Sequence, residues 1–477
     1  MKGSGLNAAE KEFADRQVKM ANNITYFHEF KEDSFSKFAE YVVSKLDQKK
    51  RPLAANTGSK QKADVIKKGA APLHEISQSL SNIDDVLNEY NKFKVGHNWI
   101  LPGTETGYID SKIATFVLEN KQVMAKCYYD HPLLCYVVDL TNEDLLQNCQ
   151  SPISRLTNVQ RLFERKLLTS MKRLPTIYSR LDVQQEKMID EILEEMQSGL
   201  FNSKSQRSEL GWIVKYLFEE FTILWKKRRY DGLIEPNDII NEALWTAEPI
   251  HIIITAITRS LNKILPQWSA EVCNSTKNSV MKTVDYDSYK NGENLSNDSI
   301  TQRKPDVWAI TDIDGIRYEV MYCEISGMPF KPDPIHIEED KRKLFRMGVR
   351  GKLLFNKNIV EQYGHALTNH LIQSISLLPI PLLRFYKRKF QLMFIDRPGK
   401  LCRATAVAPI DIPVQNSQKH KFKAFATRIC EVYLVLKNIN DEIEMIEKEI
   451  DRNEADDGNV TPLSGSTLLP LSISKSP

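Results

Sequence analysis

The sequence lacks the cysteine patterns that indicate disulfide or zinc chemistry. It has seven cysteines in 477 residues, and none forms a C-x-x-C pair or joins histidines at the spacing of a zinc site. The odd count favours free, buried thiols in a reducing compartment. The chain is therefore predicted to be intracellular, in the nucleus or the cytoplasm.

Long apolar runs are missing as well. The N-terminal residues are polar and have no signal-peptide core, and the longest apolar stretches, 251–257 and 377–383, are far too short for a bilayer. No membrane partner is expected. The sequence also has no P-loop, dinucleotide glycine fingerprint, protein-kinase set or serine-hydrolase elbow, so no motif supports those classes.

A strong charge of one sign is also absent. The net charge of +3 is too small to indicate nucleic acid by itself, so a basic binding surface has to be local. Two clusters fit this description: residues 226–229 (KKRR), which also resemble a nuclear import signal and end a predicted helix, and residues 384–389 (RFYKRK). The second cluster interleaves aromatic residues with cations. The predicted nucleic-acid contacts are Arg384, Lys387, Arg388 and Lys389.

What is present is mixed α and β patterning with an ordinary share of hydrophobic residues, 42%. The pattern predicts a helical, flexible N-terminal region over 1–95, a helical accessory region over 96–200, a mixed core over 201–437, and a helix extension with a disordered tail over 438–477. Helices are predicted at 186–196, 208–225, 239–264, 337–355 and 359–377, and a strand pair at 390–395 and 402–407. The stretch 133–140 is predicted to be a short apolar strand or another buried segment.

A long helix is predicted from Phe422 onward. Its apolar residues recur at 3-4 spacing through Ile450, over four heptads, which is the pattern of a coiled coil. Self-association through the helix Phe422–Ile450 is one interpretation. The alternative is that the first half of the helix packs on the domain while the second half projects or frays.

Residues 306–326 predict a β-hairpin that turns at Asp314-Gly315. A two-residue turn places Asp306 opposite Cys323 and directs Glu324 to the other face of the sheet. A three-residue turn instead places Asp306 opposite Tyr322, on the same face as Glu324. Joint chemistry of the two acids therefore requires the bulged turn or an equivalent bulge.

The hairpin resembles that of the PD-(D/E)XK nuclease superfamily, in Pro305-Asp306 followed by Glu324-Ile325-Ser326 and a helix. The resemblance implies a restriction-endonuclease-like core and Mg²⁺- or Mn²⁺-dependent cleavage of nucleic acid, DNA or RNA. Asp306 and Glu324 would be catalytic and would bind the metal. Glu209, near the start of a preceding helix, matches the glutamate that members often add to the metal site.

Further segments occur in an order similar to that of uncharacterised nuclease-like proteins of early-diverging fungi. They are Trp99–Gly103, His131-Pro132, Ser208–Leu210, Arg303–Asp306 and Asp340–Leu344. This wider resemblance covers about residues 97 to 437.

One member of the superfamily pattern is missing. Its lysine, two residues after the acid, is Ser326 here, and a serine hydroxyl supplies no cation. Lys341 and Lys343 on the next predicted helix are the candidate substitutes. Three functions remain open on this basis: a metal-dependent nuclease, a catalytically inactive nucleic-acid-binding protein, and an interaction scaffold that uses the C-terminal coiled coil.

Overall fold

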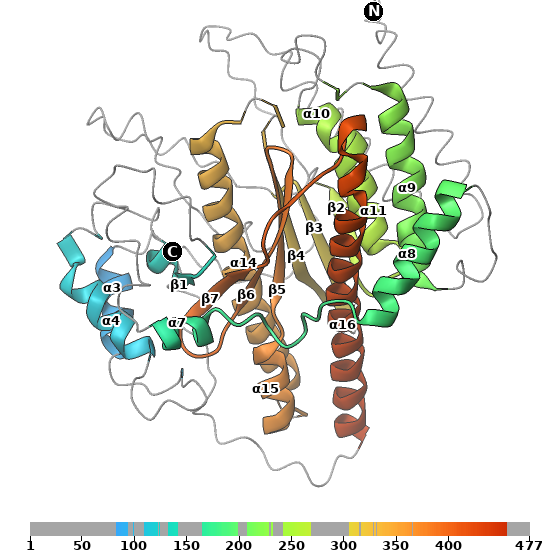
Figure 1. Cartoon of the computed structure of the whole chain (residues 1–477). Coiled ribbons are helices and arrows are strands. Elements are labelled where there is room, and N and C mark those ends of the chain that lie inside the picture. Colours follow the sequence, from blue (N-terminus) through green and yellow to red (C-terminus); the bar gives the residue numbers. More distant parts are fainter. Residues whose placement is uncertain are drawn as a thin grey trace, which may run out of the picture.

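The protein is described here from a computed structural model, and the described residues are 83–93, 99, 109–122, 124, 132–141, 165–198, 208–228, 230–231, 242–268, 305–313, 316–327, 329–330, 332–364 and 366–455. They form a mixed α/β structure with one mixed sheet and a long C-terminal helix (Figure 1). None of the helices in this part of the chain is long and apolar enough to cross a membrane. The predicted flexible segment before residue 83 and the tail after Asp456 lie outside the described residues.

In the part of the chain that the structure describes, a sheet of eight strands forms the centre. Its main path runs β1-β7-β6-β5-β4-β3-β2, and β8 pairs with β6. The β1/β7 and β4/β5 pairs are parallel, and the other pairs are antiparallel. The strands are β1 (Val137–Asp139), β2 (Leu265–Trp268), β3 (Val307–Ile313), β4 (Ile316–Ser326), β5 (Ile380–Tyr386), β6 (Lys389–Asp396), β7 (Cys402–Ala406) and β8 (Ile410–Asp411).

The predicted hairpin is confirmed as β3 and β4, with a register that combines both alternatives. Ile313 pairs with Ile316, as the two-residue turn requires and the three-residue turn does not. A bulge then shifts the register by one residue, because Ile310 pairs with Glu319 whereas Ala309 pairs with Met321. The bulge supplies the change of face that joint chemistry of the two acids requires.

The helix α14 (Pro334–Tyr363) packs against β4, β5 and β6 on one face of the sheet. Asp333 caps its N-terminus by accepting a hydrogen bond from the amide of Ile335 (2.9 Å). Close packing on the sheet requires Gly351, where an added Cβ would lie 2.2 Å from the Tyr322 hydroxyl oxygen. This face buries a small apolar cluster that includes Trp308, Tyr322 and Leu344.

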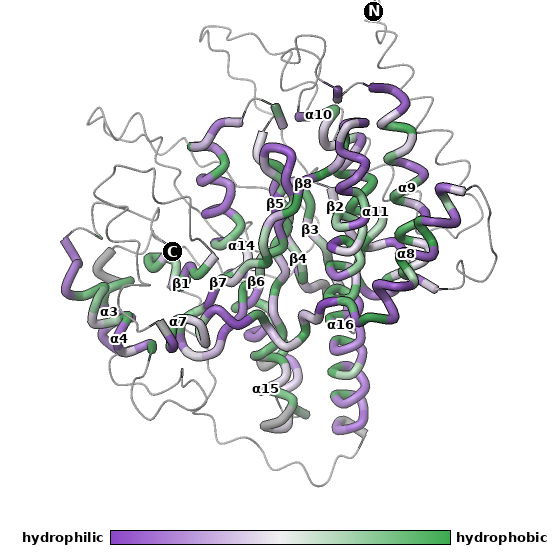
Figure 2. The backbone as a smooth tube through the Cα atoms, viewed as in Figure 1, coloured by the Kyte–Doolittle hydropathy of each residue, from purple (hydrophilic) through white to green (hydrophobic). Residues whose placement is uncertain are grey.

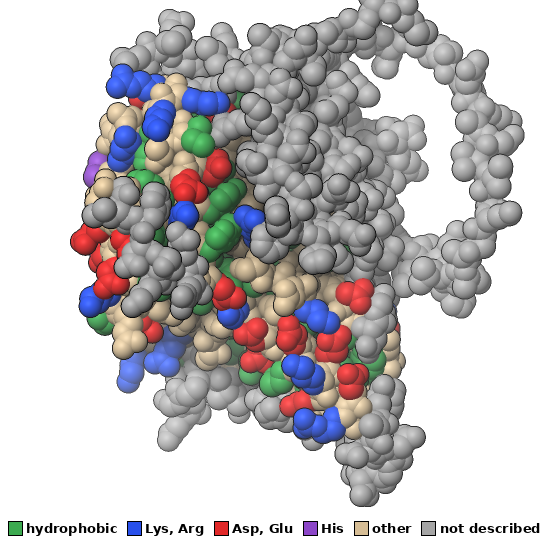
Figure 3. All heavy atoms as spheres, turned by 90° about the vertical axis from the view of Figure 1, so that its right-hand side faces the viewer, with side chains coloured by type: hydrophobic (Ala, Val, Ile, Leu, Met, Phe, Trp, Pro, Cys, Tyr) green, Lys and Arg blue, Asp and Glu red, His purple; other side chains and the backbone are tan. Residues whose placement is uncertain are grey.

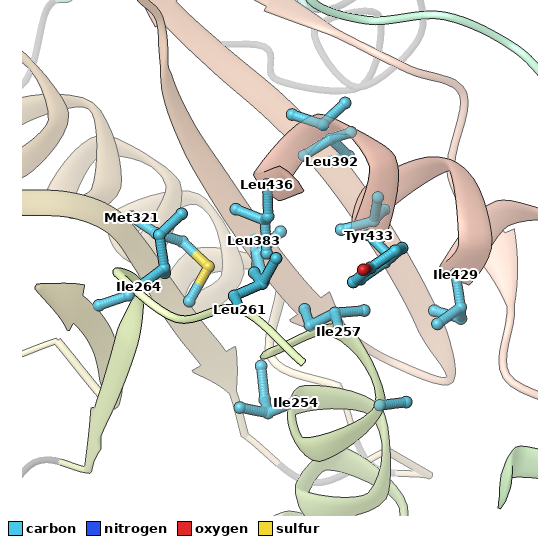
Figure 4. Close-up of a cluster of buried hydrophobic side chains, with 14 of the residues drawn as sticks. Ile254, Ile257, Leu261, Ile264, Met321, Leu383, Leu392, Ile429, Tyr433 and Leu436 are labelled. Carbon is cyan, nitrogen blue, oxygen red and sulfur yellow. The ribbon is translucent and has the colours of Figure 1, made fainter. Parts of the chain in front are cut away.

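The other face of the sheet carries the largest hydrophobic core. It is covered by α8 (Val183–Ser198), α9 (Glu209–Lys227), α11 (His251–Thr258) and α16 (Phe422–Ala455) (Figure 1). In Figure 4, Ile257 of α11 and Leu261 just after it lie near the sheet residue Leu383 and Leu436 of α16. The helices predicted at 186–196 and 208–225 are confirmed as α8 and α9, and Ser208 caps α9 by accepting from the Gly211 amide.

The apolar seam of α16 is used inside the chain. All nine of its residues are 3% exposed or less and belong to the main core: Phe422, Phe425, Ile429, Val432, Leu436, Ile439, Ile443, Ile446 and Ile450. The distal half packs as well, since Asn453 donates to the carbonyl of Ala366 and Lys263 pairs with Glu447. Figure 2 shows apolar segments of α16 on the side toward the sheet. The seam is therefore not available for the predicted coiled coil, and the distal half does not project free.

A second, smaller core lies beside the β1 edge of the sheet. It joins α3 (Ile83–Phe93), α4 (Ile109–Glu119), the 3₁₀ turn η2 (Pro132–Cys135) and residues around β1. Asp110 is fully buried there and accepts from the backbone amide of Lys400 (3.1 Å). The helix α7 (Arg165–Met171) contributes Met171. Within 133–140, predicted as a strand or a buried segment, Val137–Asp139 form β1 and the preceding residues belong to η2. The region predicted as helical and accessory therefore supplies an edge strand of the sheet.

Three predicted boundaries differ from the structure. The stretch 239–264 contains α10 (Glu242–Trp245), a π-helical turn at Thr246–Ile250 and α11, followed by β2. The helices predicted at 337–355 and 359–377 are α14 and α15 (Asn369–Leu377), with the break after Tyr363 and a cap at Thr368. The strand β5 was not predicted, whereas the pair at 390–395 and 402–407 is confirmed as β6 and β7.

Candidate active site

Two buried acids converge where β3 begins and β4 ends. The amide of Asp306 donates to the carbonyl of Cys323 (3.1 Å), and Asp306 Oδ2 accepts from the amide of Ile325 (2.8 Å). Glu324 is 1% exposed and faces α14, on the same side of the sheet as Tyr322. The two acids are close enough that Asp306 raises the pKa of Glu324 further, beyond the large effect of burial.

Lys343 of α14 supplies a cation to this pair. Its Nζ lies 2.7 Å from Glu324 Oε1 and donates a hydrogen bond to Oε2 at 2.9 Å. Burial by itself lowers the pKa of Lys343, but the carboxylates of Glu324 and Asp306 reverse this and hold its pKa above the ordinary value. Lys343 is therefore charged near neutral pH.

A third carboxylate, Asp340, belongs to the same cluster and was not predicted as a site residue. Burial raises its pKa to about 6, and the negative charge of Asp306 acts in the same direction. His336 Nε2 lies 3.3 Å from Asp340 Oδ2, and the Ser326 hydroxyl also favours the ionised form. The 3-4 spacing of 336, 340 and 343 along one helix face was the signal available in the sequence.

Lys341, the other candidate substitute, is directed elsewhere. Its Nζ lies 2.7 Å from Asp139 Oδ2 at the end of β1, and its side chain is 1% exposed. Arg384 of β5 lies between the two ion pairs: it is in register with Glu324, is 1% exposed, and donates to the carbonyl of Ile337. Burial lowers the pKa of Arg384, whereas the nearby negative charges of Asp340 and Asp139 act to raise it.

Glu209 does not join the cluster. It is the first residue of α9, on the opposite face of the sheet from α14, and its Oε2 pairs with Lys437 Nζ on α16. Its side chain is 47% exposed. The start of the helix was predicted well, but the apolar pattern gives no information about which face of the sheet the helix covers.

The predicted basic contacts separate into a buried and an exposed group. Arg384 is an interior residue rather than a surface cation. Lys387 is exposed at the turn between β5 and β6, with Arg388 and Lys389 partly exposed beside it. Arg388 donates to Gln415 Oε1 (2.7 Å) and lies 5.2 Å from the ring of Phe330.

The carboxylates fit a magnesium-type ion better than a closed metal cage. Among the residues that the structure describes, no group of three or more His, Cys, Asp and Glu side chains is arranged to hold a metal. Mg²⁺ usually keeps several waters, however, and is bound through one or two carboxylates together with substrate phosphates. Asp306 and Glu324 offer two such carboxyl groups.

No family model, curated protein or solved structure matches the chain.

Proposed function

We propose that the protein is a metal-dependent phosphodiesterase of the PD-(D/E)XK type that cleaves nucleic acid. The observation that supports this most strongly is the meeting of Asp306, Glu324 and Lys343 on one face of the sheet. Joint chemistry of the two acids requires a bulge in the hairpin, and the lysine missing at Ser326 requires a substitute from the next helix. The bulge lies in β4, and Lys343 of α14 contacts Glu324. The hairpin followed by a helix supports the superfamily resemblance, and the restriction-endonuclease-like core that the resemblance implies is part of the proposal.

Each residue has a distinct role in the proposed reaction. Asp306 and Glu324 would hold Mg²⁺ or Mn²⁺, which would neutralise phosphate charge and lower the pKa of bound water. Lys343 orients the attacking water and stabilises the charge that develops on the phosphate. Because Lys343 comes from a helix that packs on β4, its position is fixed by the same contacts that form the core.

Asp340 and His336 complete the polar environment. With a pKa near 6, Asp340 is mostly ionised at neutral pH and keeps its negative charge beside Lys343. His336 is at the solvent side of the cluster, with its side chain 46% exposed. Both residues lie on the same face of α14 as Lys343.

The test is cleavage of labelled single- and double-stranded DNA and RNA with Mg²⁺ or Mn²⁺. Asp306→Asn and Glu324→Gln keep the size of each side chain and should lose metal-dependent cleavage by at least about 100-fold, since general-base and charge-stabilising groups contribute about that much or more. Glu209→Gln is the matched control, a carboxylate on the other face, and should retain full activity.

If the wild-type protein shows no metal-dependent cleavage of any of the four substrates, the proposal fails. Cleavage that survives both Asp306→Asn and Glu324→Gln would also refute the assignment of this site. Circular dichroism of each variant establishes that a loss of cleavage does not come from a loss of folding.

A further inference from the structure

The two basic clusters of the sequence are brought to the same end of the molecule. The first follows the C-terminal turn of α9, where Lys226 and Arg228 are exposed. The second is the β5/β6 turn around Lys387. In Figure 1 the end of α9, the start of α16 and the β5/β6 turn all lie at the upper end of the sheet. The sequence separates these clusters by about 150 residues, so their proximity comes from the fold.

A third basic segment, the 3₁₀ turn η6 (Asn416–Lys421), joins the two clusters. Lys419 Nζ lies 5.3 Å from the ring of Trp225 near the end of α9. On the other side, Gln415 just before η6 accepts from Arg388 and donates to the carbonyl of Tyr230 (2.7 Å). These contacts fix the spacing of cations that belong to three different elements.

The surface formed by these segments is defined by Lys226, Lys227, Arg228, Lys387, Arg388, Lys389, Lys419 and Lys421, and is called here the basic end surface. Two acids lie within it: Asp231 at 4.0 Å from Arg228, and Asp411 at 2.6 Å from Lys421. Cations remain in excess, although the whole chain is almost neutral. Lys and Arg side chains gather at the upper end of the face drawn in Figure 3.

The basic end surface lies at the same end of the sheet as the acid cluster. Glu324 and Ser326 of β4 pair with Arg384 and Tyr386 of β5, and the turn with Lys387 follows directly. A polyanion held by this surface would therefore extend toward Asp306 and Glu324. The aromatic residues of the surface are buried, with Trp225 at 3% and Tyr230 at 1% exposure, so they offer no ring on which a base could stack.

We infer that the basic end surface binds the phosphodiester backbone of a nucleic acid, without reading its sequence, and delivers it to the acid cluster. The inference goes beyond the proposed function because binding does not require cleavage. Backbone contacts to cations release counterions, so affinity falls with salt, at a slope in log–log form of about −0.9 per phosphate on duplex DNA.

The experiment measures fluorescence anisotropy of a labelled 20-base-pair duplex of scrambled sequence, without divalent metal, from 50 to 200 mM salt. The double variant Lys387→Ala/Lys419→Ala removes one exposed cation from each of two segments. We expect about a 10-fold or greater loss of affinity at 100 mM salt and a slope shallower by about 2. A single-stranded DNA and an RNA duplex serve as further arms and identify the polymer that is preferred.

The matched control is Lys357→Ala/Lys448→Ala. These lysines lie toward the C-terminal ends of α14 and α16, and each is within 4 Å of a glutamate one turn away. This variant should bind as the wild type does. Equal affinity of the wild type and Lys387→Ala/Lys419→Ala, or binding that is independent of salt, would overturn the inference. Tighter binding to phosphatidylserine vesicles than to any of the three oligonucleotides would do so as well.

The two proposals can fail separately. Binding that persists in Glu324→Gln, with no cleavage by the wild type, supports the basic end surface and refutes the nuclease. Cleavage with unchanged affinity in Lys387→Ala/Lys419→Ala supports the nuclease and refutes the surface.

Discussion

Removing the ammonium of Lys343 should destabilise the fold through the acids that it leaves behind. Glu324 is 1% exposed, and Lys343 Nζ lies within 3 Å of both of its oxygens. At an effective dielectric constant near 20, such a contact contributes about 6 kcal/mol of attraction, which offsets part of the cost of burying the two groups. Breaking a buried pair by removing one partner typically costs about 3–5 kcal/mol. Lys343→Met should lower the free energy of unfolding by that amount.

The loss should depend on pH in a defined direction. Without Lys343, Glu324 keeps the pKa increase that burial causes, and nothing lowers it. A carboxyl whose folded-state pKa is raised stabilises the fold fully below its unfolded pKa, and this contribution is lost as pH rises through the folded value. The destabilisation by Lys343→Met should therefore be smaller at pH 5 than at pH 8.

Urea unfolding at pH 5 and pH 8 measures both effects. Glu324→Gln/Lys343→Met, which removes both charges, should be more stable at pH 8 than Lys343→Met alone. If Lys343→Met unfolds at the same urea concentration as the wild type at both pH values, the buried ion pair is not an energetic feature of the site. If the double variant is no more stable than the single variant at pH 8, the cost does not come from the unpaired carboxylate.

Other predictions follow from individual contacts. The folded pKa of Asp340, about 6, means that this carboxyl stabilises the fold below about pH 4 and that the stabilisation is lost by about pH 7. The free energy of unfolding of the wild type, measured with urea, should therefore fall by up to about 3 kcal/mol over that range because of Asp340. Asp340→Asn should lack this fall, and an unchanged fall in the variant would contradict the prediction. Gly351→Ala should cost about 1–3 kcal/mol by thermal unfolding because its Cβ would meet Tyr322, and less in a Tyr322→Phe background; equal cost in both backgrounds would count against the contact. Ile443→Ala should lower the free energy of unfolding by about 2–5 kcal/mol without changing the solution mass, since Ile443 is fully buried within the chain. Ile223→Ala, at an exposed position, should lower it little. A stable Ile443→Ala variant with altered solution mass would restore the coiled-coil interpretation.

The elements that local pattern determines were predictable. The hairpin, α8, α9, the β6/β7 pair and the full apolar seam of α16 follow from periodicity, capping and turn residues. Periodicity identifies which face of a helix is buried but not what covers it. This is why the seam of α16 was equally consistent with a second chain and with the core that it enters.

The errors come from residues whose environment overrides their usual preference. The strand β5 contains Pro381, which has no amide to donate, and Arg384, which is normally exposed, so the stretch did not read as a central strand. The bulge near Val320 shifts the register of β4 without interrupting its apolar pattern. Lys341 and Lys343 differ by two positions on α14, and only the crossing of α14 over the sheet decides which one meets Glu324.

The central claim is that Lys343 replaces the lysine missing at Ser326, and moving the cation back to the strand tests it most directly. The measurement is the initial rate of Mg²⁺-dependent cleavage by the wild type, Lys343→Ser and Ser326→Lys/Lys343→Ser. We predict cleavage by the wild type, a loss of about 100-fold or more in Lys343→Ser, and recovery of activity in the double variant, where the amine returns beside Glu324. Absence of cleavage by the wild type, or full activity in Lys343→Ser, would contradict the claim.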